Sequence, residues 1–169
     1  MTELSLDESR TKGGFVASRV QINDVRVHRV TAELKDPPQA DLPLSYHLQP
    51  AIAVNYDVGE NAFIVEAEYE LTIRQLRAIP EEGETPDEDD FRLLAEVTVM
   101  IAGLFLLDMD EEDRVPESDE VEAFGRSTGM FALHPYAREF IATLTARMGL
   151  PTLTIGVLRM DTGEVSEPL

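Results

Sequence analysis

The sequence contains no cysteine among its 169 residues. This absence excludes disulfides, thiol catalysis and zinc sites built on thiolates, and it suits a reducing compartment. Long apolar runs are also missing, since no window approaches the ~18 uninterrupted apolar residues that a membrane span requires. The polar residues 1–14 lack the apolar stretch of a signal peptide. We therefore expect a soluble cytoplasmic protein that does not insert into membranes.

Basic residues are scarce in this chain. It carries 14 Lys and Arg against 33 Asp and Glu, which gives a formal net charge of −19. Such a negative field repels phosphate groups, so nucleic acid and anionic membranes are poor partners. It attracts basic partners instead, among them unfolded chains that carry positive charge. The same acidity would also serve solubility alone, and the charge leaves both interpretations open.

Residues for catalysis or metal binding form no recognisable constellation. The spacing of Asp108, Asp110 and Glu112 resembles a calcium loop, but Asp113 stands where that loop needs glycine. We expect a solvated acidic loop there, no bound metal and no cofactor. None of the three histidines has a metal-ligand spacing: His28, His47 and His134.

Residues 125–129, Gly-Arg-Ser-Thr-Gly, match the G-x-S-x-G nucleophile elbow literally. That motif works when a strand delivers the serine to a strained turn from which a helix departs. Here an acidic stretch with helical character precedes the motif. We therefore expect a linker between two helices, with glycine for flexibility and Ser127 or Thr128 for capping. A serine esterase using Ser127 is the alternative from the enzyme class, but we expect no enzyme.

Four segments show the period of two that indicates strands: residues 19–34, 48–57, 61–74 and 91–107. The second and third read as an antiparallel hairpin with Gly59 in its turn. The first segment changes phase twice. Because a slip of one residue moves every side chain across the sheet, we expect bulges near Asn23-Asp24 and His28-Arg29.

The fourth segment is apolar on both faces from Val99 to Leu107. Such a strand needs cover on both sides, either from helices or from another subunit. Because the two helices of one subunit can hardly cover both faces, the pattern predicts an oligomer.

A helix is predicted from Leu133 to Met148, where apolar residues recur at the spacing of one helical face. Pro135 suits the first turn of this helix, and Gly149 suits the position just after its end. A shorter helix is predicted over residues 118–124.

The domain boundaries follow from composition. An extended segment is predicted over residues 153–158, and charged stretches with few apolar residues predict disorder over residues 1–13 and 80–90. We expect one domain over residues 14–160, preceded by the disordered tail and followed by a flexible C-terminal tail over residues 161–169. Its fold class is α+β: a four-stranded antiparallel sheet followed by helices.

The block Gly-Met-Phe-Ala-Leu-His-Pro-Tyr-Ala-Arg-Glu at residues 129–139 resembles the hallmark of the SecB chaperone family, in which Pro-Tyr and Arg-Glu open the main helix. Residues 150–155 are similar to the Pro-containing segment that follows that helix, and Gln49-Pro50 is similar to the start of the second strand. The agreement in order and spacing extends over residues 20–158. The resemblance implies a homotetramer built as a dimer of dimers, with long apolar grooves that hold unfolded clients without nucleotide.

The resemblance also implies which residues line the groove. Three lie on the loop between the first two strands, five around the main helix and two at the far end: Leu42, Leu44, Tyr46, Phe131, Leu133, Tyr136, Phe140, Leu144, Leu153 and Ile155. Phe140 and Leu144 have a competing interpretation as core residues. The loop residues are the stronger candidates for client binding, because a polar loop has little structural reason to carry three large apolar groups.

Family members that deliver preproteins dock the SecA motor through acidic residues on the outer face of the sheet. Leu94 and Glu96 fit one such position, whereas Arg29 reverses the charge of another. Another branch of the family protects the antitoxin of a toxin–antitoxin pair, and residues 23–26 look closer to that branch. The sequence thus predicts an ATP-independent holdase in protein export or antitoxin protection. The alternative within this class is a dedicated toxin–antitoxin chaperone without SecA docking.

Overall fold

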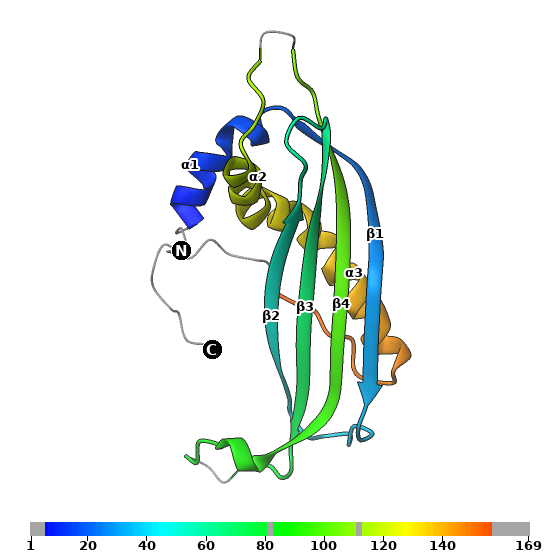
Figure 1. Cartoon of the computed structure of the whole chain (residues 1–169). Coiled ribbons are helices and arrows are strands. Elements are labelled where there is room, and N and C mark those ends of the chain that lie inside the picture. The colour runs from blue at the N-terminus through cyan, green and yellow to red at the C-terminus, as the bar shows by residue number, and fades with distance from the viewer. Residues whose placement is uncertain (1–5, 81–82, 111–112, 157–169) are drawn as a thin grey trace.

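The four alternating segments form one antiparallel sheet in a computed structural model that describes residues 6–80, 83–110 and 113–156 (Figure 1). The strand order is β1-β4-β3-β2, and every neighbouring pair is antiparallel. The predicted fold class is confirmed. The elements follow one another along the chain as α1 (Leu6–Ala17), β1 (Val20–Leu34), β2 (Leu44–Asn55), β3 (Ala62–Leu76), the 3-10 turn η1 (Glu88–Asp90), β4 (Phe91–Leu107), α2 (Ser118–Phe124), the π-helical turn η2 (Gly125–Gly129) and α3 (Met130–Arg147).

The core lies on one face of the sheet, here named the inner face. Alternate residues of β3 from Phe63 to Ile73 point to it and are almost fully buried, as are those of β4 from Val97 to Leu107. The glutamates of β3 point to the opposite, outer face. The helices α2 and α3 pack on the inner side (Figure 1). The period of two in the sequence therefore marks the residues that this face buries against the helices.

The strand β1 contains both predicted bulges. Its register against β4 shifts between Ile22 and Asp24 and again between Val27 and Arg29. Each extra residue absorbs one change of phase, so the apolar residues return to the inner face after it. Both bulge predictions are confirmed.

The strand β2 begins four residues before the predicted start, because its pairing with β3 continues as far as Leu44 opposite Gln75. The placement of Leu44 and Tyr46 on a loop was therefore wrong: both are strand residues, and of the three predicted loop residues only Leu42 precedes the strand. Pro50 lies inside β2 and removes one N–H donor. An edge strand tolerates this loss, and β2 is at the edge of the sheet.

The segment 125–129 is not a linker. It is a π-helical turn that joins α2 to α3 without a break. The glycines serve close packing, because a Cβ at Gly125 would overlap the Val54 side chain and one at Gly129 would press on Phe124. Ser127 caps nothing, since its buried hydroxyl donates to the Ala123 carbonyl 2.7 Å away within the helical run. Polar composition suggested a linker, whereas packing against β2 and β3 makes the turn helical.

The main helix is longer at its start than predicted. Pro135 consequently lies inside α3 and not in its first turn. The end of the helix agrees with the prediction. Gly149 adopts a positive φ of 79°, and the N–H groups of Gly149 and Leu150 donate to the carbonyls of Ala146 and Thr145, both at 3.1 Å. This is a Schellman motif, which explains the requirement for glycine.

The predictions of disorder were wrong for residues 6–13 and 88–90, which form helical elements. Residues 6–13 belong to α1, whose Val16 is fully buried and whose Gly13 packs against the backbone of Phe124. The first five residues of the predicted tail, and residues 81–82 of the acidic loop, lie outside the described part. The remainder of that loop ends in η1, which Asp87 caps by accepting from the N–H groups of Asp89 and Asp90.

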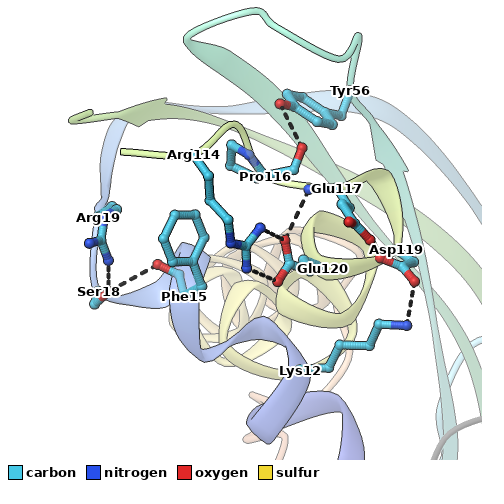
Figure 2. A network of polar contacts seen from close by, with 10 residues as sticks. All are labelled: Lys12, Phe15, Ser18, Arg19, Tyr56, Arg114, Pro116, Glu117, Asp119 and Glu120. Atoms are coloured by element: carbon cyan, nitrogen blue, oxygen red, sulfur yellow. Dashed lines mark hydrogen bonds and ion pairs between the residues drawn. The ribbon is translucent and has the colours of Figure 1, made fainter. Parts of the chain in front are cut away.

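Charged side chains fasten α1 to α2 and to the segment before it (Figure 2). The ring of Phe15 lies between two guanidinium groups, with the Arg19 and Arg114 carbons 4.3 and 4.2 Å from its centroid. Arg114 donates to both carboxylate oxygens of Glu120, at 2.5 and 2.7 Å, and Lys12 pairs with Asp119. These hydrogen bonds from Arg114 lower the pKa of Glu120 to about 2.

The replacement Glu120→Gln tests this attachment. At pH 7 we expect it to lower the free energy of unfolding by about 1–2 kcal/mol, with the half-exposed Arg114 keeping the loss below the full pKa shift. Because the pKa of Glu120 is lowered on folding from its ordinary 4.5, its contribution is present above about pH 4.5 and is lost as the pH falls towards 2. Urea unfolding from pH 7 to pH 3.5 should therefore show the two proteins converging. Glu122→Gln, at an exposed site on the same helix, is the control and should change stability by less than ~0.5 kcal/mol. A gap that stays constant over this range would contradict the assignment.

Candidate functional site

The helix α3 covers the middle of the inner face and leaves its two edges partly open. It runs diagonally behind the sheet from the β2 side at its start (Figure 1). The helical run touches Val54 of β2 at Gly125, while further on Leu133 packs where a Cβ on Gly103 of β4 would lie 2.6 Å away. The absence of a side chain at Gly103 thus sets how closely α3 approaches the sheet. Both edge strands keep apolar side chains that the helix does not cover.

The open edge on β1 is an apolar row. Its residues lie opposite inner-facing residues of β4, yet each remains about 40% exposed: Ile22 39%, Val27 41%, Val30 40% and Leu34 42%. Monomeric proteins seldom expose a contiguous set of large aliphatic groups on one strand. The two bulges of β1 correct the phase of its alternation, so that these residues lie on one face. Their exposure was missed because the sequence does not say that β1 is an edge strand beyond the helix.

The open edge on β2 carries two of the predicted groove residues. Tyr46 lies on the inner face opposite Ile73 and is 41% exposed, whereas Leu44 is half-buried against the core. Leu42 is half-buried in the preceding loop. That loop is held from below by the buried Gln75, whose amide donates to the carbonyls of Gln39 and Leu42 at 2.8 and 3.0 Å. The fixed loop therefore presents the lower end of β2 as a defined surface.

The predicted residues of the main helix divide by exposure. Leu133 is fully buried in the core, so its assignment to a client-facing groove was wrong for the conformation described. Phe140 and Leu144 are half-buried against the same core, as the competing interpretation held. Phe131 is half-buried, and Tyr136 is 48% exposed. Tyr136 on α3 and Tyr46 on β2 are thus the exposed aromatic members of the predicted set.

The last two predicted residues lie on a segment that follows the helix. Residues 150–156, here named the strap, double back along α3 and pass behind β3 and β2 (Figure 1). Ile155 is 2% exposed and belongs to the core, which contradicts its assignment to an open lining, and Leu153 is half-buried. His134 Nε2 donates to the carbonyl of Gly156 at 2.9 Å. Of the predicted extended segment, residues 157–158 lie outside the described part.

Two polar atoms beside the strap have no hydrogen-bond partner among the described residues. They are Nδ1 of His134 and the hydroxyl of Tyr69, whose rings lie 5.9 Å apart. Burial raises the pKa of Tyr69 to about 12. An unsatisfied buried hydroxyl is a desolvation cost without a compensating bond. Buried polar atoms without a hydrogen-bond partner thus lie on the inner face where α3, β3 and the strap meet.

The outer face places basic side chains over the glutamates of β3. Arg29 reaches across Met100 to Glu68 at 2.6 Å, and Nδ1 of His28 lies 2.8 Å from Glu66. Beside these pairs, an apolar hollow of about 370 Å³ is lined by Asp24, Arg26, Val27, His28, Ile64, Ala102 and Leu104. The outer side of β4 thus stays partly uncovered in one subunit.

The two residues of the predicted SecA docking site, Leu94 and Glu96, do not lie on one exposed surface. The register between β3 and β4 shifts at Ile73, which turns Leu94 into the core with 0% exposure. The assignment of Leu94 to an outer docking site was therefore wrong. Glu96 remains exposed and pairs with Lys35 at 3.2 Å.

The structure gives the esterase alternative no accessible nucleophile, since Ser127 is buried within the helical run. Within residues 8–80, 83–110 and 113–156, no cluster of three acidic or histidine side chains is arranged to hold a metal ion. No helix in the described part of the chain is long and apolar enough to cross a membrane.

Comparison with known proteins agrees with this arrangement, although no protein-family model matches the chain. The SecB-like chaperone Rv1957 of Mycobacterium tuberculosis H37Rv is 33% identical over 147 residues, which cover 86% of this chain and 81% of the relative. The chain belongs to the SecB-like chaperone family. The SecB-like chaperone MT2006 of strain CDC 1551 matches to the same extent.

A solved structure extends the agreement to the fold of this SecB-like chain. It contains M. tuberculosis Rv1957 in complex with a ChAD peptide from the Rv1956 HigA1 antitoxin, and it aligns with a TM-score of 0.75 at 31% identity. The alignment covers 92% of this chain and 100% of that chain. The family resemblance carried by the Pro-Tyr-Ala-Arg-Glu block is thereby confirmed.

The buried hydroxyl of Tyr69 predicts an alkaline dependence of stability. Its pKa is raised on folding from 10 to about 12, so the unfolded state ionises first and wild-type stability falls as the pH rises from 10 to 12, by up to ~1.4 kcal/mol per pH unit. Tyr69→Phe should lack this loss. At pH 7 it should be unchanged or up to ~1 kcal/mol more stable, because an unsatisfied group is removed. Urea unfolding at pH 7, 10 and 11 measures both effects, and parallel profiles for the two proteins would contradict the burial of an un-ionised hydroxyl.

Proposed function

We propose that this SecB-like chain is an ATP-independent holdase that binds unfolded polypeptide on the open edges of its inner face. The observation that carries the proposal is the apolar row of β1, Ile22, Val27, Val30 and Leu34, each about 40% exposed on a chain of net charge −19. Exposed aliphatic surface supplies affinity for apolar segments of a client. The negative charge speeds the encounter with basic clients and keeps nucleic acid away.

The client favoured by the comparisons is an antitoxin. The aligned Rv1957 structure contains a peptide from the HigA1 antitoxin. At 31% identity over that whole chain, similar surfaces are expected here, and we assign this chain the same class of client. It would act in the cytoplasm and hold the antitoxin until its toxin is bound.

Protein export through SecA is the second candidate, and the outer face argues against it. Docking there requires free acidic residues on the sheet. Arg29 instead pairs with Glu68 at 2.6 Å, and Glu96 pairs with Lys35 at 3.2 Å. With Leu94 in the core, the apolar half of the docking site is absent from the surface. These contacts favour the dedicated toxin–antitoxin chaperone without SecA docking.

Assembly into a homotetramer, as a dimer of dimers, is part of the proposal. Leu106 on the outer side of β4 is 39% exposed, and Ile64 beside it on β3 is 37% exposed. A neighbouring subunit would cover this apolar surface, which one subunit leaves open.

Light scattering at micromolar concentration tests the assembly. We expect a mass about four times the 18.8 kDa of one chain, because the apolar surface needs cover from other copies. Leu106→Glu should shift the mass towards smaller species, whereas Val115→Glu, at an exposed apolar site on another surface, should not. A wild-type protein that runs as an 18.8 kDa monomer would refute the assembly.

The exposed tyrosines test the holdase proposal. We expect Tyr46→Ser with Tyr136→Ser to reduce suppression of aggregation of a chemically unfolded model client several-fold, because two exposed aromatic contacts are removed. Stability should change by only ~0.5 kcal/mol per site, since both positions are exposed.

The matched control is Val58→Ser with Ile79→Ser, which removes two apolar groups exposed to 68% and 70% in the connections that flank β3. This control should retain full activity. A thermal melt on the same samples separates lost binding from lost folding. Full activity of the double tyrosine variant would show that clients bind elsewhere. No suppression by the wild-type protein, with any model client, would refute the holdase function itself.

A further inference from the structure

The strap has the form of an extended peptide bound in a groove. It follows the Schellman turn at Gly149 and runs back beside α3, so that Thr154 and Ile155 face Pro135, Arg138 and Ala142 of the helix. Between these residues lies a hollow of about 320 Å³, to which Glu139 also contributes. The strap is therefore seated on the inner face without filling the space beside it.

Few interactions hold the strap. In the part of the chain that the structure describes, no backbone–backbone hydrogen bond joins residues 151–156 to another element, and none of them belongs to a helix or strand. Among the described residues, one side-chain hydrogen bond joins residues 151–156 to another element, from His134 Nε2 to the carbonyl of Gly156 at 2.9 Å. The remaining attachment is apolar, through the buried Ile155 and the half-buried Leu153. A segment held by side chains and one hydrogen bond opens far more readily than a strand in a ladder.

The contacts of the strap are ones that another chain could make. The pocket of Ile155 accepts an aliphatic side chain, and the donor of His134 recognises a backbone carbonyl, which every polypeptide carries. Leu153 and Ile155 are two residues apart, so they lie on one side of the extended segment. Nothing in this set of contacts depends on the strap belonging to the same molecule.

We propose that the strap occupies a binding site for an extended apolar client segment, and that a client binds by displacing it. The client segment carries two aliphatic residues at positions i and i+2. The carbonyl of residue i+3 accepts the hydrogen bond from His134. The strap thus limits access to the site, and clients of weak apolar character do not open it. This inference rests on the proposed holdase function, and it adds to the open edges of the inner face a second site that the strap regulates.

The competing arrangement has the strap as a fixed wall of the groove, with clients binding on top of it. The two arrangements predict opposite changes in the exposure of Ile155 and in the affinity for the client. Displacement exposes Ile155 when a client binds, whereas a fixed wall becomes better covered. Weakening the strap raises client affinity in the first case, because a larger fraction of the protein is competent to bind, and lowers it in the second.

The absence of cysteine from the chain makes a direct test available. The variant Ile155→Cys places a unique thiol in the buried position, and Thr152→Cys places one at an exposed position of the same strap. The rate of reaction with a thiol reagent is measured with and without reduced, carboxymethylated α-lactalbumin, a permanently unfolded chain. We expect the client to speed the reaction at position 155 about tenfold or more and to leave position 152 little changed. Slower or unchanged reaction at position 155 would overturn displacement.

Affinity for the same client provides the second measurement. Ile155→Ser should bind it about tenfold more tightly than wild type, while Thr152→Ser should bind as wild type does. Weaker binding of the client by Ile155→Ser, with an intact thermal melt, would show that the strap is a fixed wall of the groove and is not displaced. Leu153→Cys repeats the thiol test with the same expected sign if the variants at position 155 do not fold. A wild-type protein that does not bind the client would refute the holdase function, whereas normal wild-type binding with the wrong sign at position 155 refutes only the strap.

Discussion

Everything in this molecule depends on how closely one helical run can approach the inner face of the sheet. The run from α2 through η2 to α3 is continuous, and it packs where three glycines leave no side chain: Gly103 on the sheet, Gly125 and Gly129 in the π-helical turn. A methyl group at Gly125 would meet Val54, and one at Gly103 would meet Leu133. This close approach buries the middle of the sheet. Because a single helix is narrower than four strands, it also leaves both edges open.

The parts of this structure that depend on local periodicity could be predicted from the sequence. The alternation in β3 and β4, the two bulges of β1 and the glycine after α3 each leave a signal within a few residues. The parts that depend on distant partners could not. The helix α1 has two glycines in its second half and weak periodicity. It forms because Val16 is buried, Arg114 packs on Phe15 and Lys12 pairs with Asp119. The burial of Leu94 depends on the pairing of β4 with β3, in which Leu94 is itself the extra residue that no β3 residue opposes.

The same distinction between local pattern and distant packing applies to the candidate site. Residue type and family resemblance predict that apolar residues of β2 and α3 line one client-binding surface, and this stays a prediction. Exposure could not be predicted in this way, because Leu133 and Tyr136 are neighbours on the surface of α3, yet one is fully buried and the other is 48% exposed. The apolar row of β1 was missed for the converse reason: its pattern is that of a buried strand, and its side chains stay about 40% exposed because α3 packs mainly on β4 and β3.

The two bulges of β1 have a consequence for the behaviour of the protein in a crowded solution. An edge strand with a row of exposed aliphatic groups is a template on which identical chains add into fibrils. Each bulge interrupts the regular spacing of N–H and C=O groups along that edge and increases its twist, so a second β1 cannot match it over its full length. The strand keeps its exposed apolar side chains, but its backbone is not flat enough for identical strands to add to it one after another. A chain that must expose apolar surface to its clients is thereby protected from becoming an aggregation seed itself.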